Sequence, residues 1–174
     1  MTDPAPRFTR RHLLAIAAAT GAAGALAGGG RVWSWWDRPS TDGYQMLSAD
    51  EVELVESLCE AIFPPGGTPA ISGREVGAAR YVDDVLGDVV EPMGNLLRLV
   101  LHALDDWSRL TRRTGWASLS VDERGEALQS WTHHESHLVR GAITGLLVFI
   151  CSAYTTHPEV QEAAGWQFPC GYER

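Results

Sequence analysis

The sequence predicts an all-α protein: a small bundle of about five helices, preceded by an apolar leader and followed by an irregular C-terminal tail. In several segments apolar residues recur every three or four positions, as on the buried face of an amphipathic helix. Ser48, Ser72 and Ser120 are each followed three residues later by glutamate, the capping-box signature of a helix start. No segment shows the alternation of apolar and polar residues that is typical of a half-buried strand.

The helices are expected at 48–62, 72–86, 92–115, 120–131 and 134–154, with a short turn at 157–160. The first stops at Pro64 and Pro65, because proline cannot continue a helix. The side chains expected to face the core are Val52, Val55, Leu58, Cys59, Ile62, Val76, Ala79, Val82, Val85, Leu86, Met93, Leu96, Leu97, Val100, Leu101, Leu104, Trp107, Ala127, Leu128, Trp131, Leu138, Val139, Ala142, Ile143, Leu146, Leu147 and Ile150.

The N-terminus has the pattern of a twin-arginine export signal. Arg10 and Arg11 precede an Ala/Gly-rich apolar run to Gly30, and Ala25-Leu26-Ala27 fits a small-x-small cleavage site. We therefore expect a signal peptide at 1–27, an extended lead-in at 28–46 and a helical domain at 47–174. The twin-arginine translocase would be the transient partner of Arg10 and Arg11, and the mature protein would lie in the periplasm or on the outer face of the cytoplasmic membrane. An uncleaved anchor is the alternative.

The charge balance is acidic. The chain has 14 Lys and Arg against 22 Asp and Glu, a formal net charge of −8 over 174 residues. This charge argues against nucleic acid or an anionic membrane surface as a partner. The length that remains after the leader suits one domain.

Few residues suggest catalytic or metal-binding chemistry. Cys59, Cys151 and Cys170 lie far apart and form no C-x-x-C motif. In an oxidising periplasm two of them could pair, but Cys59 and Cys151 fall on apolar helix faces where a free thiol packs as a small hydrophobe. Asp83-Asp84 and Asp105-Asp106 are adjacent acidic pairs that we interpret as solvated or paired with arginine.

The one metal-site candidate is the cluster of His133, His134 and His137. On a helix, His133 and His137 are i,i+4 neighbours, and two imidazoles could converge on one metal ion. The favoured interpretation is a solvated or locally hydrogen-bonded helix end, because no ligand-rich partner segment accompanies the cluster.

Residues 47–86, LSADEVELVESLCEAIFPPGGTPAISGREVGAARYVDDVL, resemble the opening of the gluconate 2-dehydrogenase subunit 3 family. The shared pattern is a helix closing in Ile62-Phe63-Pro64, a Gly67-Thr68-Pro69 turn, and Gly77-Ala78 ahead of Tyr81-Val82-Asp83. The leader is also similar to the family's, and so is the stretch from Tyr154 to Val160.

The resemblance implies a non-catalytic small subunit of a periplasmic flavin-dependent dehydrogenase. Such a subunit supplies the export signal and acts as the folding and assembly partner of an FAD-binding large subunit of the glucose–methanol–choline type. It binds no cofactor itself, the FAD is in the large subunit, and electrons pass to a cytochrome c or another membrane acceptor. Two alternatives stay open: a membrane-anchored structural or assembly protein, and a free-standing periplasmic metal-binding protein that uses His133, His134 and His137.

Aromatic residues outside the predicted helices are candidates for the partner interface. Such residues either cover the ends of a bundle or anchor a partner, and Trp and Tyr are frequent interface hot spots. We expect contact with the flavoprotein through Trp33, Trp35, Trp36, Phe63, Trp166, Phe168 and Tyr172.

Overall fold

The computed structural model describes residues 38–166, and within them the chain is helical without a strand. The all-α prediction is confirmed. The elements in this part are α3 (Ala49–Ile62), α4 (Ala78–Asp88), α5 (Glu91–Arg112), the 3-10 turn η2 (Trp116–Ser118), α6 (Val121–Thr132), α7 (His137–Thr156) and α8 (Pro158–Ala163). The last of these is a short helix where the sequence predicted a turn. The leader, the lead-in up to residue 37 and the end of the tail lie outside the described residues.

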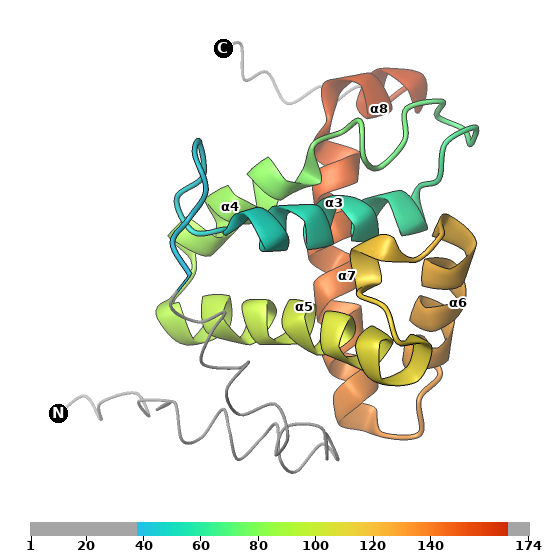
Figure 1. Cartoon of the computed structure of the whole chain (residues 1–174). Coiled ribbons are helices and arrows are strands. Elements are labelled where there is room, and N and C mark those ends of the chain that lie inside the picture. Colours follow the sequence, from blue (N-terminus) through green and yellow to red (C-terminus); the bar gives the residue numbers. More distant parts are fainter. Residues whose placement is uncertain (1–37, 167–174) are drawn as a thin grey trace, which may run out of the picture.

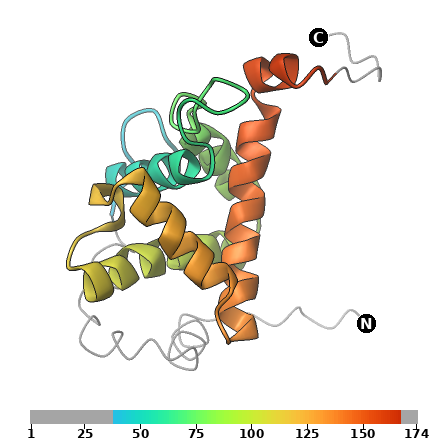
Figure 2. The ribbon, with the colours of Figure 1, turned by 90° about the vertical axis from the view of Figure 1, so that its right-hand side faces the viewer.

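Helix α7 organises the bundle. It runs along one side of the body and packs against α3, α4, α5, α6 and α8 (Figures 1 and 2). Its residues Ile143, Leu146 and Ile150 are fully buried and join a core cluster that includes Val55 of α3 and Val82 of α4. Helix α7 is therefore the helix against which the others bury apolar side chains.

Two of the three predicted capping boxes begin helices. The backbone N–H of Ser48 donates to Glu51 Oε2 at 2.9 Å, and α3 starts at the next residue. At α6, the N–H of Glu123 donates to Ser120 Oγ at 3.3 Å. These local patterns located two helix starts to within a residue.

The third box forms but does not begin a helix, which corrects the prediction of a helix from Ser72. The N–H of Ser72 donates to Glu75 Oε2 at 2.7 Å, yet these residues make only a turn. Gly77 follows in the left-handed conformation, with φ of 68°, and α4 starts after it. The N-terminus of α4 is capped instead from α3, because Glu56 Oε1 accepts the N–H of Ala79 at 3.0 Å.

Some predicted core residues lie at the surface. Met93, Leu96 and Trp107 of α5 are exposed, whereas Leu97, Leu101 and Leu104 of the same helix are buried. Helix α5 carries more apolar positions than one buried face accommodates, and periodicity alone does not say which stripe faces inward. Leu138 is also exposed, because α7 begins at His137 and its first turn extends past the core.

Candidate functional site

A buried carboxylate fixes the chain where it enters the bundle. Asp83 is almost fully buried, and its carboxylate accepts three backbone N–H hydrogen bonds, from Gln45 at 2.7 Å, Met46 at 2.8 Å and Leu47 at 2.9 Å. The expectation of a solvated or arginine-paired Asp83 is therefore wrong. Its neighbour Asp84 is exposed, as predicted. We call this arrangement the Asp83 clamp.

The sequence contained a signal for the clamp. Asp83 shares the inner face of α4 with Ala79, Val82 and Leu86, so helical spacing placed it inward. A charge on an apolar face must find partners, and free backbone N–H groups are suitable ones. The same helix also holds the preceding turn, because the Arg80 guanidinium stacks on the Tyr44 ring at 4.9 Å from its centroid.

A second buried carboxylate joins α3 to α5. Glu51 Oε1 lies 2.7 Å from Arg98 Nε and 3.0 Å from His102 Nε2, and the glutamate is fully buried. Burial alone raises the pKa of Glu51, but hydrogen bonds with His102, Arg98 and Ser48 outweigh it and lower the pKa to about 2. The sequence analysis missed this link. Its signal was a basic residue and a histidine at i,i+4 spacing on the core side of an apolar helix.

Two further charged groups connect elements. Arg124 of α6 is buried and donates to the Ser57 carbonyl at 2.7 Å, the Leu119 carbonyl at 3.0 Å and Glu60 Oε2 at 2.9 Å.

Asp105 accepts the N–H of Trp116 at 2.8 Å and pairs with Arg109, as the expectation of an arginine partner required. Chemically, such groups fix the position of one helix against another.

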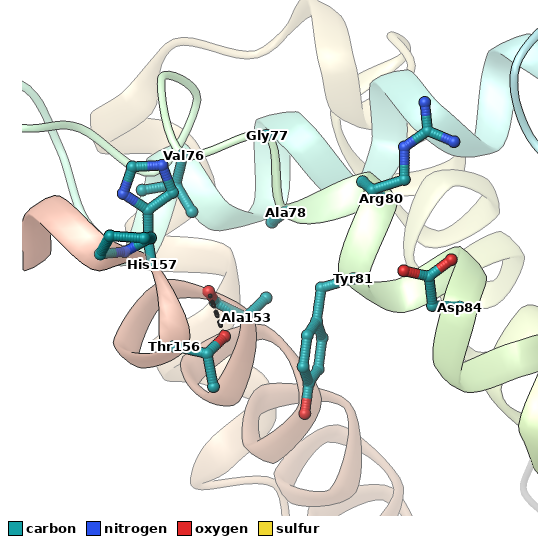
Figure 3. Close-up of a pocket in the computed structure, with 10 residues that line it drawn as sticks. Val76, Gly77, Ala78, Arg80, Tyr81, Asp84, Ala153, Thr156 and His157 are labelled. Carbon is teal, nitrogen blue, oxygen red and sulfur yellow. Dashed lines mark hydrogen bonds between the residues drawn. The ribbon is translucent and has the colours of Figure 1, made fainter. Parts of the chain in front are cut away.

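An open cleft of about 250 Å³ lies between α4 and the junction of α7 with α8. Figure 3 shows Arg80, Tyr81 and Asp84 extending from α4 on one side, with Thr156 and His157 on the other. The Thr156 hydroxyl is already bonded within α7, to the Ser152 carbonyl at 2.9 Å and the Ala153 carbonyl at 3.1 Å. The polar groups line the rim and do not converge on one point, so the cleft suits a small group or a partner's side chain.

The three histidines do not share a helix, which corrects the geometry expected for a metal site. His133 caps the C-terminus of α6, His134 lies in the link, and His137 is the first residue of α7. His133 Nδ1 donates to the Gln129 carbonyl at 2.9 Å, and His134 Nδ1 accepts the N–H of Ser136 at 3.0 Å. Among residues 38–166, no group of three or more His, Cys, Asp or Glu side chains could hold a metal ion.

Cys59 and Cys151 are free thiols in the structure. Cys59 is fully buried in α3, and burial, with smaller contributions from Glu56 and Cys151, raises the pKa of its thiol to about 12. Burial also raises the pKa of Cys151, which is half-buried. Cys59 packs as a small hydrophobe, as predicted, while Cys170 lies outside the described residues.

The structure describes two of the seven aromatic candidates for the partner interface. Phe63 is half-buried and stacks on the Tyr154 ring, with centroids 3.6 Å apart and planes 5° apart. Trp166 follows α8 and is exposed. Outside the described residues lie the remaining candidates Trp33, Trp35, Trp36, Phe168 and Tyr172, and the signal residues Arg10 and Arg11.

Helix α7 is the one helix of the described part that is long and apolar enough to cross a membrane. Its 20 residues include a window of mean hydropathy 1.6, of which 28% is buried. The core helix of a folded domain passes the same test, and α7 packs against five other helices of the bundle.

One comparison with known proteins identifies the family of the chain. A family model described as gluconate 2-dehydrogenase subunit 3 matches residues 49–170, more than half of the chain. The chain belongs to the gluconate 2-dehydrogenase subunit 3 family. The family's span starts at the first residue of α3 and continues past α8, so it includes every helix described above. No curated protein and no solved structure matches the chain. By its family, this chain is a subunit of a dehydrogenase complex.

Proposed function

We propose that this chain is the non-catalytic small subunit of a periplasmic flavin-dependent dehydrogenase. It carries the twin-arginine signal for the complex and acts as the folding and assembly partner of an FAD-binding large subunit of the glucose–methanol–choline type. The observation that carries the proposal is the family match over residues 49–170. The FAD belongs to the large subunit, and a cytochrome c or another membrane acceptor receives the electrons.

The buried charges support a structural role for this chain. The Asp83 clamp, the Glu51–Arg98 pair and Arg124 use their hydrogen-bonding groups to fix backbone and helices. General acid–base catalysis needs a group whose pKa lies near the working pH and whose polar atoms reach the substrate. Glu51 has a pKa of about 2 and is fully enclosed by its own partners. These groups are suited to holding a rigid scaffold.

The domain organisation follows from the same proposal. Residues 1–27 are the signal, 28–46 the lead-in and 47–174 the body. The Asp83 clamp supports the boundary at 47, because it binds backbone positions 45–47 directly ahead of α3. We propose that flavoprotein contacts include the aromatic residues of the lead-in and the tail, together with Phe63: Trp33, Trp35, Trp36, Phe63, Trp166, Phe168 and Tyr172.

The test is an export experiment with the flavoprotein co-expressed. Replacing Arg10 and Arg11 by lysine removes the twin arginines, while Arg7→Lys is a matched control of the same chemistry outside them. In the double variant both this chain and the flavoprotein should remain in the cytoplasm, and dehydrogenase activity should disappear from the periplasm. The control should export both proteins normally.

Each contrary outcome identifies an alternative. Normal export of the double variant would contradict the twin-arginine assignment. A chain that remains in carbonate-washed membranes and retains no flavoprotein would favour the membrane-anchored structural protein. Stoichiometric metal in the purified chain, lost when His133, His134 and His137 are replaced, would favour a metal-binding protein.

A further inference from the structure

Helix α5 carries an exposed apolar stripe beside its buried face. Met93 is 48% exposed, Leu96 37%, Trp107 44% and Leu110 65%. With Ala103, also exposed, these residues follow helical spacing and form what we call the α5 outer face. Apolar side chains beside the buried face of a helix are normally covered by a neighbour, but α5 lies at the margin of the described body (Figure 1).

Helix α5, which carries the outer face, is held in place by its contacts with the core. On the adjoining face of α5, Leu97, Leu101 and Leu104 are buried in the core. Arg98 and His102 hold the helix to Glu51 of α3. The orientation of α5 is therefore set by contacts that do not involve the outer face. A preformed apolar surface of this kind loses little conformational entropy when a partner covers it.

Aromatic side chains extend the face toward α6. The ring of Trp107 meets that of Trp131 edge-on, with centroids 5.8 Å apart and planes 83° apart. Trp107 remains substantially exposed in spite of this contact. A large exposed aromatic among aliphatic neighbours is the composition of an interface centre, where Trp is over-represented among hot spots.

The net charge of the chain limits which molecules could cover the α5 outer face. The chain carries a formal charge of −8, which opposes contact with an anionic bilayer and association with a second copy of itself. Membership of a dehydrogenase-subunit family supplies the remaining candidate, a partner subunit. We propose that the α5 outer face is the surface on which the FAD-binding large subunit docks. This inference rests on the function proposed above.

The first described residue, Arg38, is attached to the helix that holds α5. Arg38 forms an ion pair with Asp50 in the first turn of α3, and the next residue, Glu51, is bonded to Arg98 of α5. The described chain therefore begins on the helix that is joined to α5.

The tail leaves the body elsewhere. Trp166 follows α8, which lies at the opposite end of α7 from α5 (Figure 1). Helix α7 has 20 residues, about 30 Å at 1.5 Å per residue. Trp166, the last described residue, is therefore not part of the α5 outer face.

The experiment is affinity purification of the full-length chain co-expressed with the flavoprotein in cells that lack the twin-arginine translocase. The test variant is Leu96→Glu with Leu110→Glu. The matched control is Leu138→Glu with Val148→Glu on α7, where the side chains are 50% and 58% exposed and the change in charge is the same. Retained flavoprotein is measured by flavin absorbance and protein staining, and folding by helical circular dichroism and the thermal midpoint.

The α5 variant should retain at least about tenfold less flavoprotein than wild type, with unchanged helical content, and the α7 control should retain a normal amount. If the double variant fails to fold, Leu110→Glu alone provides the test. Normal retention by a folded α5 variant would overturn the inference. A wild-type dimer that the α5 variant dissociates, or binding of wild type alone to phosphatidylglycerol vesicles, would also overturn it. A wild-type chain that retains no flavoprotein would overturn the proposed function itself.

Discussion

Gly73 lies directly against the last turn of α3, so that a β-carbon at position 73 would stand 2.2 Å from the carbonyl oxygen of Cys59. The N–H of Gly73 also donates to the Phe63 carbonyl at 2.8 Å, which folds the 64–72 loop back onto α3. Gly73→Ala should destabilise the protein by about 3 kcal/mol or more, because the clash is with backbone that cannot rotate away. Urea unfolding measures the change.

Gly125→Ala is the matched control for that substitution. Gly125 lies inside α6, where a β-carbon would meet nothing within 4 Å. Alanine should therefore raise the free energy of unfolding by up to about 1 kcal/mol. Equal effects at the two positions would contradict the close contact between Gly73 and α3.

Removing the Asp83 carboxylate should strongly destabilise the protein. Asp83→Ala leaves the N–H groups of Gln45, Met46 and Leu47 without their acceptor, and we expect a loss of about 3 kcal/mol in unfolding free energy. Asp84→Ala, an exposed carboxylate one residue away, should change stability by less than about 0.5 kcal/mol. The expectation fails if thermal unfolding does not distinguish the two variants.

Glu51 should make stability depend on pH in the acid range. Its pKa falls from 4.5 to about 2 on folding, so the stabilisation is fully present above about pH 5 and is lost as the pH falls through about 2. The shift corresponds to about 3 kcal/mol at neutral pH. Glu51→Gln should be less stable at pH 7 and should show a flatter loss of stability between about pH 5 and pH 2.

Glu126→Gln removes an exposed carboxylate that pairs with Arg112 on the surface. This control should keep the wild-type stability at pH 7 and the wild-type acid profile. Denaturant unfolding at a series of pH values compares the three proteins. A Glu51→Gln profile as steep as wild type would assign the acid sensitivity to other groups.

The two described thiols should differ in reactivity. Because burial raises the pKa of Cys59 to about 12, almost no thiolate is present at pH 8, and the side chain is also enclosed. In a Cys170→Ser background, iodoacetamide should modify half-buried Cys151 first and Cys59 only as the protein unfolds. Peptide mass spectrometry over time separates the sites. Equal labelling of Cys59 and Cys151 in the native protein would contradict the packing of α3.

Sequence patterns predicted helix starts correctly where the interactions that begin the helix lie within one turn. The boxes at Ser48 and Ser120 start helices because both partners lie within one turn. The same pattern at Ser72 produced only a turn, since Gly77 takes a left-handed conformation and Glu56, from another helix, caps α4. The contact with Glu56 is tertiary, so the local sequence around Ser72 does not show it.

The candidate sites were harder to predict because they depend on contacts between different helices. Periodicity showed that α5 is amphipathic, but it did not show that Arg98 and His102 of this helix bind Glu51 of another helix. The helical spacing expected for the histidine cluster did not form, because α6 ends at Thr132, which puts His133 and His137 on different elements. The family resemblance of residues 47–86 was the most informative feature, and the match over 49–170 confirms it.

The Asp83 clamp also determines how the body responds to a pull on its N-terminus. Tension applied ahead of residue 38 meets three hydrogen bonds that converge on one side chain of α4 before it reaches the body of α3. The strain is thereby shared with a second helix embedded in the core, so α3 is not peeled away turn by turn. Mechanical resistance in this direction comes from tertiary structure, and Asp83→Ala should lower the force at which a tethered molecule begins to unravel.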